Sequence, residues 1–193
     1  MSLLSAFSLG RKEKEKLTGH KGIVVWLYGL SGSGKSTLAN TTEMLLHSKG
    51  VLTKIIDGDA IRNSLNADLG FSMKDRTENI RRSAEVAKLF SENGVVSLCC
   101  FVTPTNEMRA HAKKTIGAED FIEVFLSASL QCCEKRDVKG LYAKARVGEV
   151  KNFTGIDSAF EKPSAADLII DTENNSLEKS AEQLYTYILE KIK

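Results

Sequence analysis

The feature that most constrains this chain is a glycine-rich stretch at residues 29–37, Gly-Leu-Ser-Gly-Ser-Gly-Lys-Ser-Thr. It fits the pattern G-x-x-x-x-G-K-[ST] of a phosphate-binding loop. An apolar run over residues 23–28 leads into it and a helix-compatible run over residues 37–47 leads out, which is the setting the motif requires. Glycines let backbone N–H groups turn around a polyphosphate, and the positive end of the next helix faces the anion. The residues predicted to bind the triphosphate are Gly29, Leu30, Ser31, Gly32, Ser33, Gly34, Lys35, Ser36 and Thr37.

Two side chains of this loop have a defined chemistry. Lys35 is placed to reach the β- and γ-phosphates and to act in catalysis, and the Ser36 hydroxyl is placed to ligate Mg²⁺. The alternative is a glycine-rich turn with no ligand. The agreement of glycine spacing, the Lys-Ser pair and the flanking elements favours the phosphate-binding loop.

Composition limits the class of protein. The chain has 193 residues, 42% hydrophobic and 27% charged, with a net charge of +2, which is ordinary for one globular α/β domain and gives no sign of a nucleic-acid binder. No window is long and apolar enough to predict a membrane span. The basic cluster at residues 11–16 follows the apolar residues 1–9, the wrong order for a signal peptide. The adjacent cysteines at 99–100 and 132–133 predict buried reduced thiols and a cytoplasmic location.

Apolar runs and helical patterns alternate along the chain. The continuous apolar run at residues 23–28 predicts a strand buried on both faces. The alternation of strands with helices along the chain predicts an α/β fold of the P-loop nucleoside-triphosphate hydrolase type, with a five-stranded parallel sheet and helices on both faces. We expect one kinase domain over residues 21–193, with a mobile basic lid around residues 140–157. Residues 1–20 are expected to form an extension, either a loose tail or a dimer arm, in which Leu3, Leu4 and Phe7 make one amphipathic turn. The predicted strands are residues 23–28, 51–56, 95–102, 121–126 and 167–171.

Two carboxylates, Asp57 and Asp59, follow the second predicted strand. That end of a strand lies on the edge where open α/β sheets bind ligands. Asp59 also has a structural interpretation as the cap of a short helix over residues 60–65.

A long helix over residues 76–93 is predicted to begin at Asp75, with Glu78 completing a capping box. Polar and cationic residues gather near its start, where the helix dipole prefers anions. A bound anion resolves this conflict, and a solvated basic face is the alternative. The residues concerned are Arg76, Asn79, Arg81 and Arg82.

Together these features predict an enzyme that transfers a phosphoryl group from a nucleoside triphosphate to a small molecule. The chain has no N/T-K-x-D motif at a strand end, which a signalling GTPase needs to read its base. The acceptor does not follow from the spacing of residues.

Four stretches resemble the adenylylsulfate kinase (APS kinase) family of P-loop kinases, and the similarity extends over about residues 17–172. The phosphate-binding loop is shared by many kinases. Asp-Leu-Gly-Phe with Glu-Asn-Ile-Arg-Arg, and Lys-Gly-Leu-Tyr with Phe-Thr-Gly-Ile-Asp, are far more selective. The four stretches are residues 29–37, 57–62, 68–82 and 136–146, the last continuing to 153–157.

The resemblance implies transfer of the γ-phosphoryl group of ATP to the 3′-hydroxyl of adenosine 5′-phosphosulfate (APS), giving 3′-phosphoadenosine 5′-phosphosulfate (PAPS). It implies Lys35, Asp59 and Asp57 as catalytic residues, with Asp57 holding Mg²⁺ through water, and Arg136 as an ATP contact. Asp59 either accepts the proton of the 3′-hydroxyl or orients it. The implied APS-binding residues are Asp59, Arg62, Phe71, Arg76, Asn79, Thr103, Lys139 and Phe153.

Within that set, Phe71 and Phe153 resemble the pair that sandwiches the acceptor's adenine, although each also fits an ordinary loop anchor. After the third strand the family pattern Ser-Pro-aromatic is replaced by Thr-Pro-Thr-Asn at residues 103–106, which keeps a hydroxyl but not the aromatic ring. The resemblance also implies a homodimer and a functional link to a separate ATP sulfurylase.

Two other functions remain open from the sequence. One is another small-molecule kinase of the same fold, for a nucleotide or a sugar. The other is a regulatory protein that binds ATP or APS without turnover, against which the presence of Lys35 and Asp59 argues.

Overall fold

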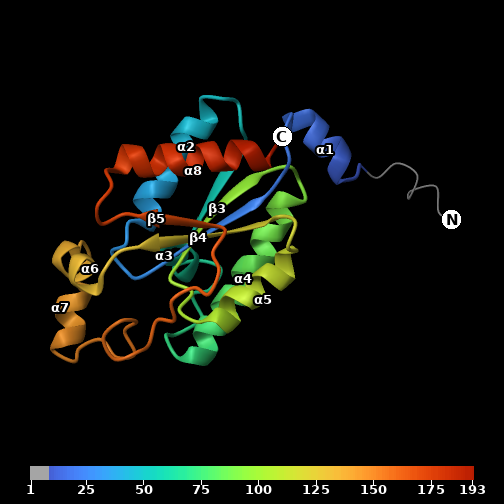
Figure 1. Cartoon of the computed structure of the whole chain (residues 1–193). Helices are drawn as coiled ribbons and strands as arrows, with labels where there is room; N and C mark the ends of the chain where they lie inside the picture. Colours follow the sequence, from blue (N-terminus) through green and yellow to red (C-terminus); the bar gives the residue numbers. More distant parts are fainter. Residues whose placement is uncertain (1–8) are drawn as a thin grey trace.

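A fully parallel sheet of five strands, in the order β2-β3-β1-β4-β5, forms the centre of the computed structural model, which describes residues 9–193 (Figure 1). The predicted five-stranded parallel sheet is therefore confirmed. Its central strand is continuously apolar and every residue of it is buried, as expected for a strand covered on both faces. The strands are β1 (Val24–Tyr28), β2 (Thr53–Asp57), β3 (Val96–Phe101), β4 (Phe121–Ser127) and β5 (Leu168–Asp171).

Helices cover both faces of this sheet, as predicted. Helices α2 (Lys35–His47) and α8 (Leu177–Lys191) lie on one face, and α4 (Met73–Ser91) and α5 (Asn106–Ile116) lie on the other (Figure 1). Alternate residues of β1 divide between two cores, since successive strand side chains point to opposite faces. Leu27 joins the core of α2 and α8, and its neighbour Trp26 joins the core of α4 and α5.

The strand order places a crevice at the carboxyl edge of the sheet. Strand β1 is flanked by β3 and β4, so the chain crosses from one side of β1 to the other between these two strands. In open α/β sheets ligands bind outside the carboxyl ends of the strands at such a switch point. The phosphate-binding loop follows β1 directly and therefore lies at this point.

The basic run near the N-terminus forms helix α1 (Arg11–Thr18), so the expected loose tail is wrong for these residues. The Arg11 guanidinium donates to both carboxylate oxygens of Asp120 and to the carbonyl oxygen of Gly22. These bonds tie the helix to the segments before β4 and before β1, although no α1 residue is buried. The amphipathic turn proposed for Leu3, Leu4 and Phe7 lies outside the described residues.

Helix α4 begins one turn earlier than predicted. Ser72 is its N-cap, and Ser72 Oγ accepts a hydrogen bond from Asp75 N at 3.2 Å and donates to Asp75 Oδ2 at 2.7 Å. Asp75 is thus the third helical residue and not the cap. Its carboxylate lies in the first turn, where it complements the helix dipole.

The basic residues farther along α4 are paired within the chain. Arg81 and Arg82 both donate to Glu78, and Arg82 also makes two hydrogen bonds of 2.7 and 2.9 Å to Asp68. The hydrogen bonds from Arg81 and Arg82 lower the pKa of Glu78 to about 2. A bound anion is therefore not needed to neutralise Arg81 and Arg82.

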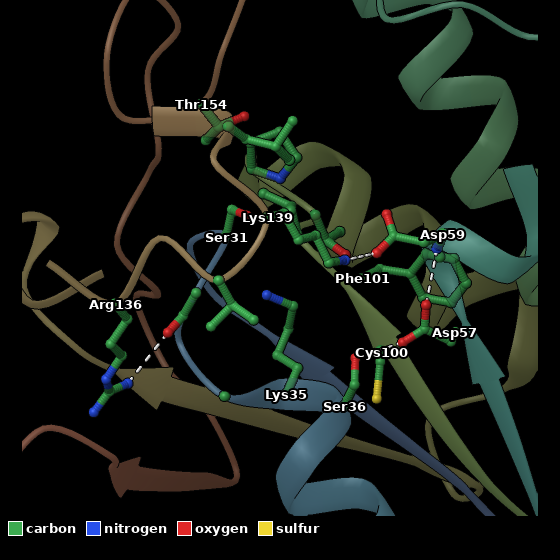
Figure 2. A pocket seen from close by; sticks show the side chains of 18 of the residues that line it. Ser31, Lys35, Ser36, Asp57, Asp59, Cys100, Phe101, Arg136, Lys139 and Thr154 are labelled. Atoms are coloured by element: carbon green, nitrogen blue, oxygen red, sulfur yellow. Dashed lines mark hydrogen bonds and ion pairs between the residues drawn. The ribbon is translucent and has the colours of Figure 1, made fainter. Parts of the chain in front are cut away.

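The short helix after β2 is α3 (Gly58–Arg62), and its cap is Asp57. Asp57 Oδ1 accepts the backbone N–H of Asp59 at 2.9 Å. The suggestion that Asp59 is the cap is therefore wrong. The Asp59 side chain is free of that task and points toward Lys139 (Figure 2).

Two further short helices, α6 (Leu130–Arg136) and α7 (Leu141–Arg146), follow β4 and lie together at the edge of the molecule (Figure 1). Cys99, Cys100 and Cys133 are buried and Cys132 is partly exposed, and all four are unpaired. Across residues 9–193, no helix combines the length and the apolar character that crossing a bilayer demands.

Candidate active site

A cavity of about 680 Å³ opens at the carboxyl edge of the sheet. Its wall comes from the phosphate-binding loop, the end of β2, the start of α4, the loop after β3, and the segment from α6 through residue 154. All eight residues expected to bind APS line this cavity: Asp59, Arg62, Phe71, Arg76, Asn79, Thr103, Lys139 and Phe153. The expected ATP and Mg²⁺ residues that line it are Ser31, Gly32, Gly34, Lys35, Ser36, Thr37, Asp57 and Arg136.

Three residues of the loop, Gly29, Leu30 and Ser33, are not part of the cavity wall. Gly29 has φ of 150°, and a Cβ atom there would lie 2.8 Å from the Leu126 carbonyl oxygen, so only glycine fits. Gly34 has φ of 93° and is the N-cap of α2, which has no side-chain cap among the described residues. The first N–H groups of α2 are therefore left to bind an anion.

Lys35 is partly buried at the centre of the site (Figure 2). Its ammonium group donates to the carbonyl oxygens of Gly29 at 3.0 Å and Leu30 at 2.7 Å, which are both in its own loop. Burial lowers the pKa of Lys35 to about 8. The ammonium is thus held inside the loop and pays a desolvation cost that a bound polyphosphate would offset.

Ser36 and Asp57 bring two oxygen ligands to one point. Ser36 Oγ donates to Asp57 Oδ2 at 2.5 Å, while Asp57 Oδ1 caps α3. A hydroxyl beside a carboxylate suits Mg²⁺, which prefers oxygen ligands and keeps several waters. The residues predicted from the sequence to hold the metal therefore do lie together.

Asp59 and Lys139 face each other across the cavity and form an ion pair (Figure 2). Both side chains are more than half exposed, at 65% and 56%. An ion pair this exposed contributes little to stability, so both groups are available to a ligand.

Arg62 and Arg76 organise the loop that carries Phe71. Arg62 donates to the Gly70 carbonyl oxygen at 2.8 Å, and its guanidinium lies 4.6 Å from the centre of the Phe71 ring. Arg76 donates to the Phe71 carbonyl oxygen at 2.9 Å and reaches Thr154 Oγ1, also at 2.9 Å. The aromatic ring is 61% exposed, so it presents a face to the cavity while its backbone is held.

Tyr142 joins helix α7 to the phosphate-binding loop, and its role was not predicted from the sequence. Its hydroxyl donates to the Ser31 carbonyl oxygen at 2.8 Å, and its ring packs edge-on against Phe153 with centroids 4.9 Å apart. Tyr142 belongs to the selective Lys-Gly-Leu-Tyr stretch, which is the only signal of it in the sequence.

Arg136 and Thr172 enclose the other side of the loop. The Arg136 guanidinium donates to the carbonyl oxygens of Gly32 and Thr172. Thr172 Oγ1 donates to the Ser33 carbonyl oxygen at 2.8 Å. Thr172 was also missed, although its position just after the last strand, at the carboxyl edge, is a usable signal.

The segment at residues 103–106 has a local structural explanation. Thr103 is 1% exposed with φ of 40°, and its hydroxyl accepts a hydrogen bond from Trp26 Nε1 at 2.9 Å. Thr105 is the N-cap of α5 and accepts the backbone N–H of Met108 at 3.2 Å. Thr105 therefore caps helix α5 at the position where the family pattern has an aromatic residue. The Thr103 hydroxyl is bonded to the buried Trp26 side chain.

A phosphate-binding loop at the switch point, an adjacent hydroxyl–carboxylate pair and a basic segment over the cavity define a P-loop kinase. The sequence model of adenylylsulphate kinase matches residues 21–171. An adenylyl-sulfate kinase of Phocaeicola vulgatus is 54% identical over 181 residues, covering 94% of this chain and 89% of that protein. This chain is an enzyme that belongs to the adenylylsulphate kinase family.

Two solved structures place the fold among its relatives. The Mycobacterium tuberculosis APS kinase in complex with AMPPNP and APS has a TM-score of 0.84 and 46% identity, with 88% of this chain and 98% of that chain covered. A sugar kinase from Janibacter has a TM-score of 0.60 but only 17% identity, with 86% and 94% covered. The second likeness concerns the fold alone.

Proposed function

We propose that this enzyme transfers the γ-phosphoryl group of ATP to the 3′-hydroxyl of APS, giving PAPS and ADP. The observation that carries the proposal is the meeting, in one cavity, of the phosphate-binding loop and the full set of residues that the family pattern associates with APS. Membership of the adenylylsulphate kinase family supports the same acceptor. The sugar kinase from Janibacter shares only its fold with this chain, so it gives no support to a sugar acceptor.

The donor side is the phosphate-binding loop with Arg136. In the proposal, the N–H groups at the start of α2 and the Lys35 ammonium bind the β- and γ-phosphates. Ser36 would hold Mg²⁺ directly and Asp57 would hold it through water, a division that suits two oxygen groups in contact at 2.5 Å. The metal, when bound, neutralises charge that develops on the phosphates.

The acceptor side is the loop and helix around Phe71. Arg62 and Arg76 suit the phosphosulfate because guanidinium forks bind oxyanions through paired hydrogen bonds. The adenine stacks between Phe71 and Phe153, which both line the cavity. Asn79 and Thr103 complete the wall on this side.

Asp59 acts on the acceptor hydroxyl. The transition state of phosphoryl transfer is loose and needs little early proton removal, so orientation of the hydroxyl is the main task of Asp59. Lys139, which pairs with Asp59, turns to the phosphates when the substrates bind. The lid at residues 140–157 then keeps water from the γ-phosphoryl group.

We also propose a domain organisation, a compartment and partners for the enzyme. Residues 21–193 form one kinase domain preceded by an extension at residues 1–20. The protein acts in the cytoplasm, a reducing compartment that suits its four unpaired cysteines. It acts there as a homodimer. A separate ATP sulfurylase supplies its APS. Light scattering of the purified protein tests the dimer.

The function is tested by ADP release from ATP and Mg²⁺ with and without APS, with the nucleotide products identified by mass. We expect ADP and PAPS in equal amounts, only with APS present, and no turnover after chelation of Mg²⁺. ADP without APS dependence, or a phosphorylated product other than PAPS, contradicts the proposal.

Replacing Phe71 by alanine is expected to raise KM for APS about tenfold and to leave KM for ATP within about twofold, because stacking of a base on an aromatic ring contributes on the order of 1–3 kcal/mol. Steady-state kinetics with each substrate varied in turn measures both values. The side chain is 61% exposed, so folding should be unaffected. Leu89→Ala, an exposed apolar truncation on α4 away from the cavity, is the control. Equal increases in both KM values would assign Phe71 to the wrong substrate.

A further inference from the structure

A buried pair of asparagine side chains lies beside the acceptor half of the cavity. Asn66 is 0% exposed in the turn between α3 and α4, and Asn79 is 4% exposed on α4. Asn66 Nδ2 donates to Asn79 Oδ1 at 3.0 Å. Asn79 lines the cavity and Asn66 does not. Asn66 is therefore behind the wall that Asn79 presents to a ligand.

This hydrogen bond determines which end of the Asn79 amide faces the cavity. A side-chain amide has one acceptor oxygen and one NH₂ donor, on opposite sides of its carbon. Since Oδ1 of Asn79 is used by Asn66, its Nδ2 points away from Asn66. No described residue accepts a hydrogen bond from Asn79 Nδ2. The donor is therefore left for a ligand.

Stability alone does not explain Asn66. Its Oδ1 is buried and finds no hydrogen-bond donor within residues 9–193. A buried acceptor without a partner lowers stability, so such a group calls for another explanation. The backbone of the same turn is already fixed, because Asn66 N donates to the Ile61 carbonyl oxygen at 2.9 Å and Leu69 N donates to the Asn66 carbonyl oxygen at 3.0 Å.

The charge around Asn79 makes its orientation matter. Arg76 is one turn earlier on the same helix, and Arg62 lines the same cavity, so this region is built for an anion. An amide NH₂ adds a donor to that anion, whereas an amide oxygen in the same place repels it.

We infer that Asn66 is a positioning residue for APS: by bonding the oxygen of Asn79 it fixes the Asn79 NH₂ toward an acceptor oxygen of the bound nucleotide. The inference rests on the proposed function, since it names a residue behind the APS site. Asn66 itself touches no substrate. It acts on the affinity for APS and leaves the ATP half of the site unchanged.

The kinetic test replaces Asn66 by aspartate, which keeps the shape but has no donor. Asn79 then turns over to donate to the new carboxylate and presents its oxygen to the cavity. We expect KM for APS to rise about tenfold or more, and KM for ATP to stay within about twofold, because a hydrogen bond to a charged group is lost. Asn63→Asp adds the same charge at an exposed position of the same turn and is the control. Equal effects on both substrates, or no effect, overturn the inference.

A second measurement follows the wild-type protein during titration, so its result does not depend on how Asn66→Asp folds. The side-chain ¹H–¹⁵N signals of Asn79 are assigned by their loss in Asn79→Asp and followed during titration with APS in the absence of ATP. We expect the NH₂ signals of Asn79 to shift strongly and those of Asn66 to stay close to their free positions. Unchanged Asn79 signals in the APS-saturated protein overturn the inference. If the wild-type enzyme shows no APS-dependent ADP release, the proposed function itself is wrong, and the inference about Asn66 fails with it.

Discussion

Lys35→Ala is expected to lower kcat about 10³-fold while weakening ATP binding far less, because the ammonium stabilises charge that is greatest in the transition state. The Lys35 ammonium donates hydrogen bonds to the Gly29 and Leu30 carbonyl oxygens. When a polyphosphate binds, the Lys35 ammonium exchanges these neutral carbonyl acceptors for charged phosphate oxygens. The positive charge then lies next to the phosphoryl group that is transferred. Single-turnover rates and calorimetric ATP affinity separate the two effects.

The pH dependence of the wild-type enzyme provides a second readout of the same residue. Burial lowers the pKa of Lys35 to about 8, so the free enzyme loses the proton of this ammonium as pH rises through 8. The value of kcat/KM for ATP is expected to fall above that pH, and kcat to hold to a higher pH, since bound phosphates favour the charged form. Lys35→Ala should remove this limb of the profile. The control is Lys54→Ala, which removes an exposed lysine on the edge strand β2. Unchanged turnover in Lys35→Ala would refute the catalytic assignment of Lys35.

The parts of the site that the sequence predicted best are contiguous in the chain. The phosphate-binding loop and the Asp-Gly-Asp segment each contain, within a few residues, the strand, turn and side chains that define their geometry. The apolar runs likewise predicted the sheet, most clearly at β1 and β3, where every residue is buried and burial on both faces leaves little room for polar residues.

Helix starts were harder, since two capping boxes overlap at the beginning of α4. Ser72 with Asp75 and Asp75 with Glu78 both have the required spacing of three residues. Glu78 is occupied by Arg81 and Arg82, so it does not reach back to the backbone of Asp75. Only the side-chain pairing seen in three dimensions decides between the two boxes.

Nothing in the sequence identifies which distant residues pair with each other. Arg11 bonds Asp120, 109 residues away, and this contact turns a charged run that looked like a loose tail into an attached helix. Tyr142 bonds Ser31 across 111 residues and so couples helix α7 to the phosphate-binding loop. Neither pair is distinguished by spacing or composition, so both required the structure.

Asp59→Asn is expected to lower kcat about 10²-fold, in the range of a positioned group that assists proton transfer or orients a hydroxyl. The structure makes this variant a clean test. Asp57 and not Asp59 caps α3, so the helix keeps its cap. The Asp59–Lys139 ion pair is exposed, so its loss should change the free energy of unfolding by less than about 1 kcal/mol.

The companion variant Asp57→Ala separates the two carboxylates. It removes the cap of α3 and one partner of Ser36, so it should lower the free energy of unfolding by about 1 kcal/mol and also raise the Mg²⁺ concentration needed for activity. Thermal unfolding and a Mg²⁺ titration of the rate measure these changes. An Asp59→Asn enzyme with near-normal kcat and a lowered melting temperature would contradict the catalytic assignment. In Asp59→Asn, we expect kcat to fall while the melting temperature and the Mg²⁺ dependence stay constant. Such a loss belongs to the step at the acceptor hydroxyl, because effects on stability and on metal binding are expected from Asp57 and not from Asp59.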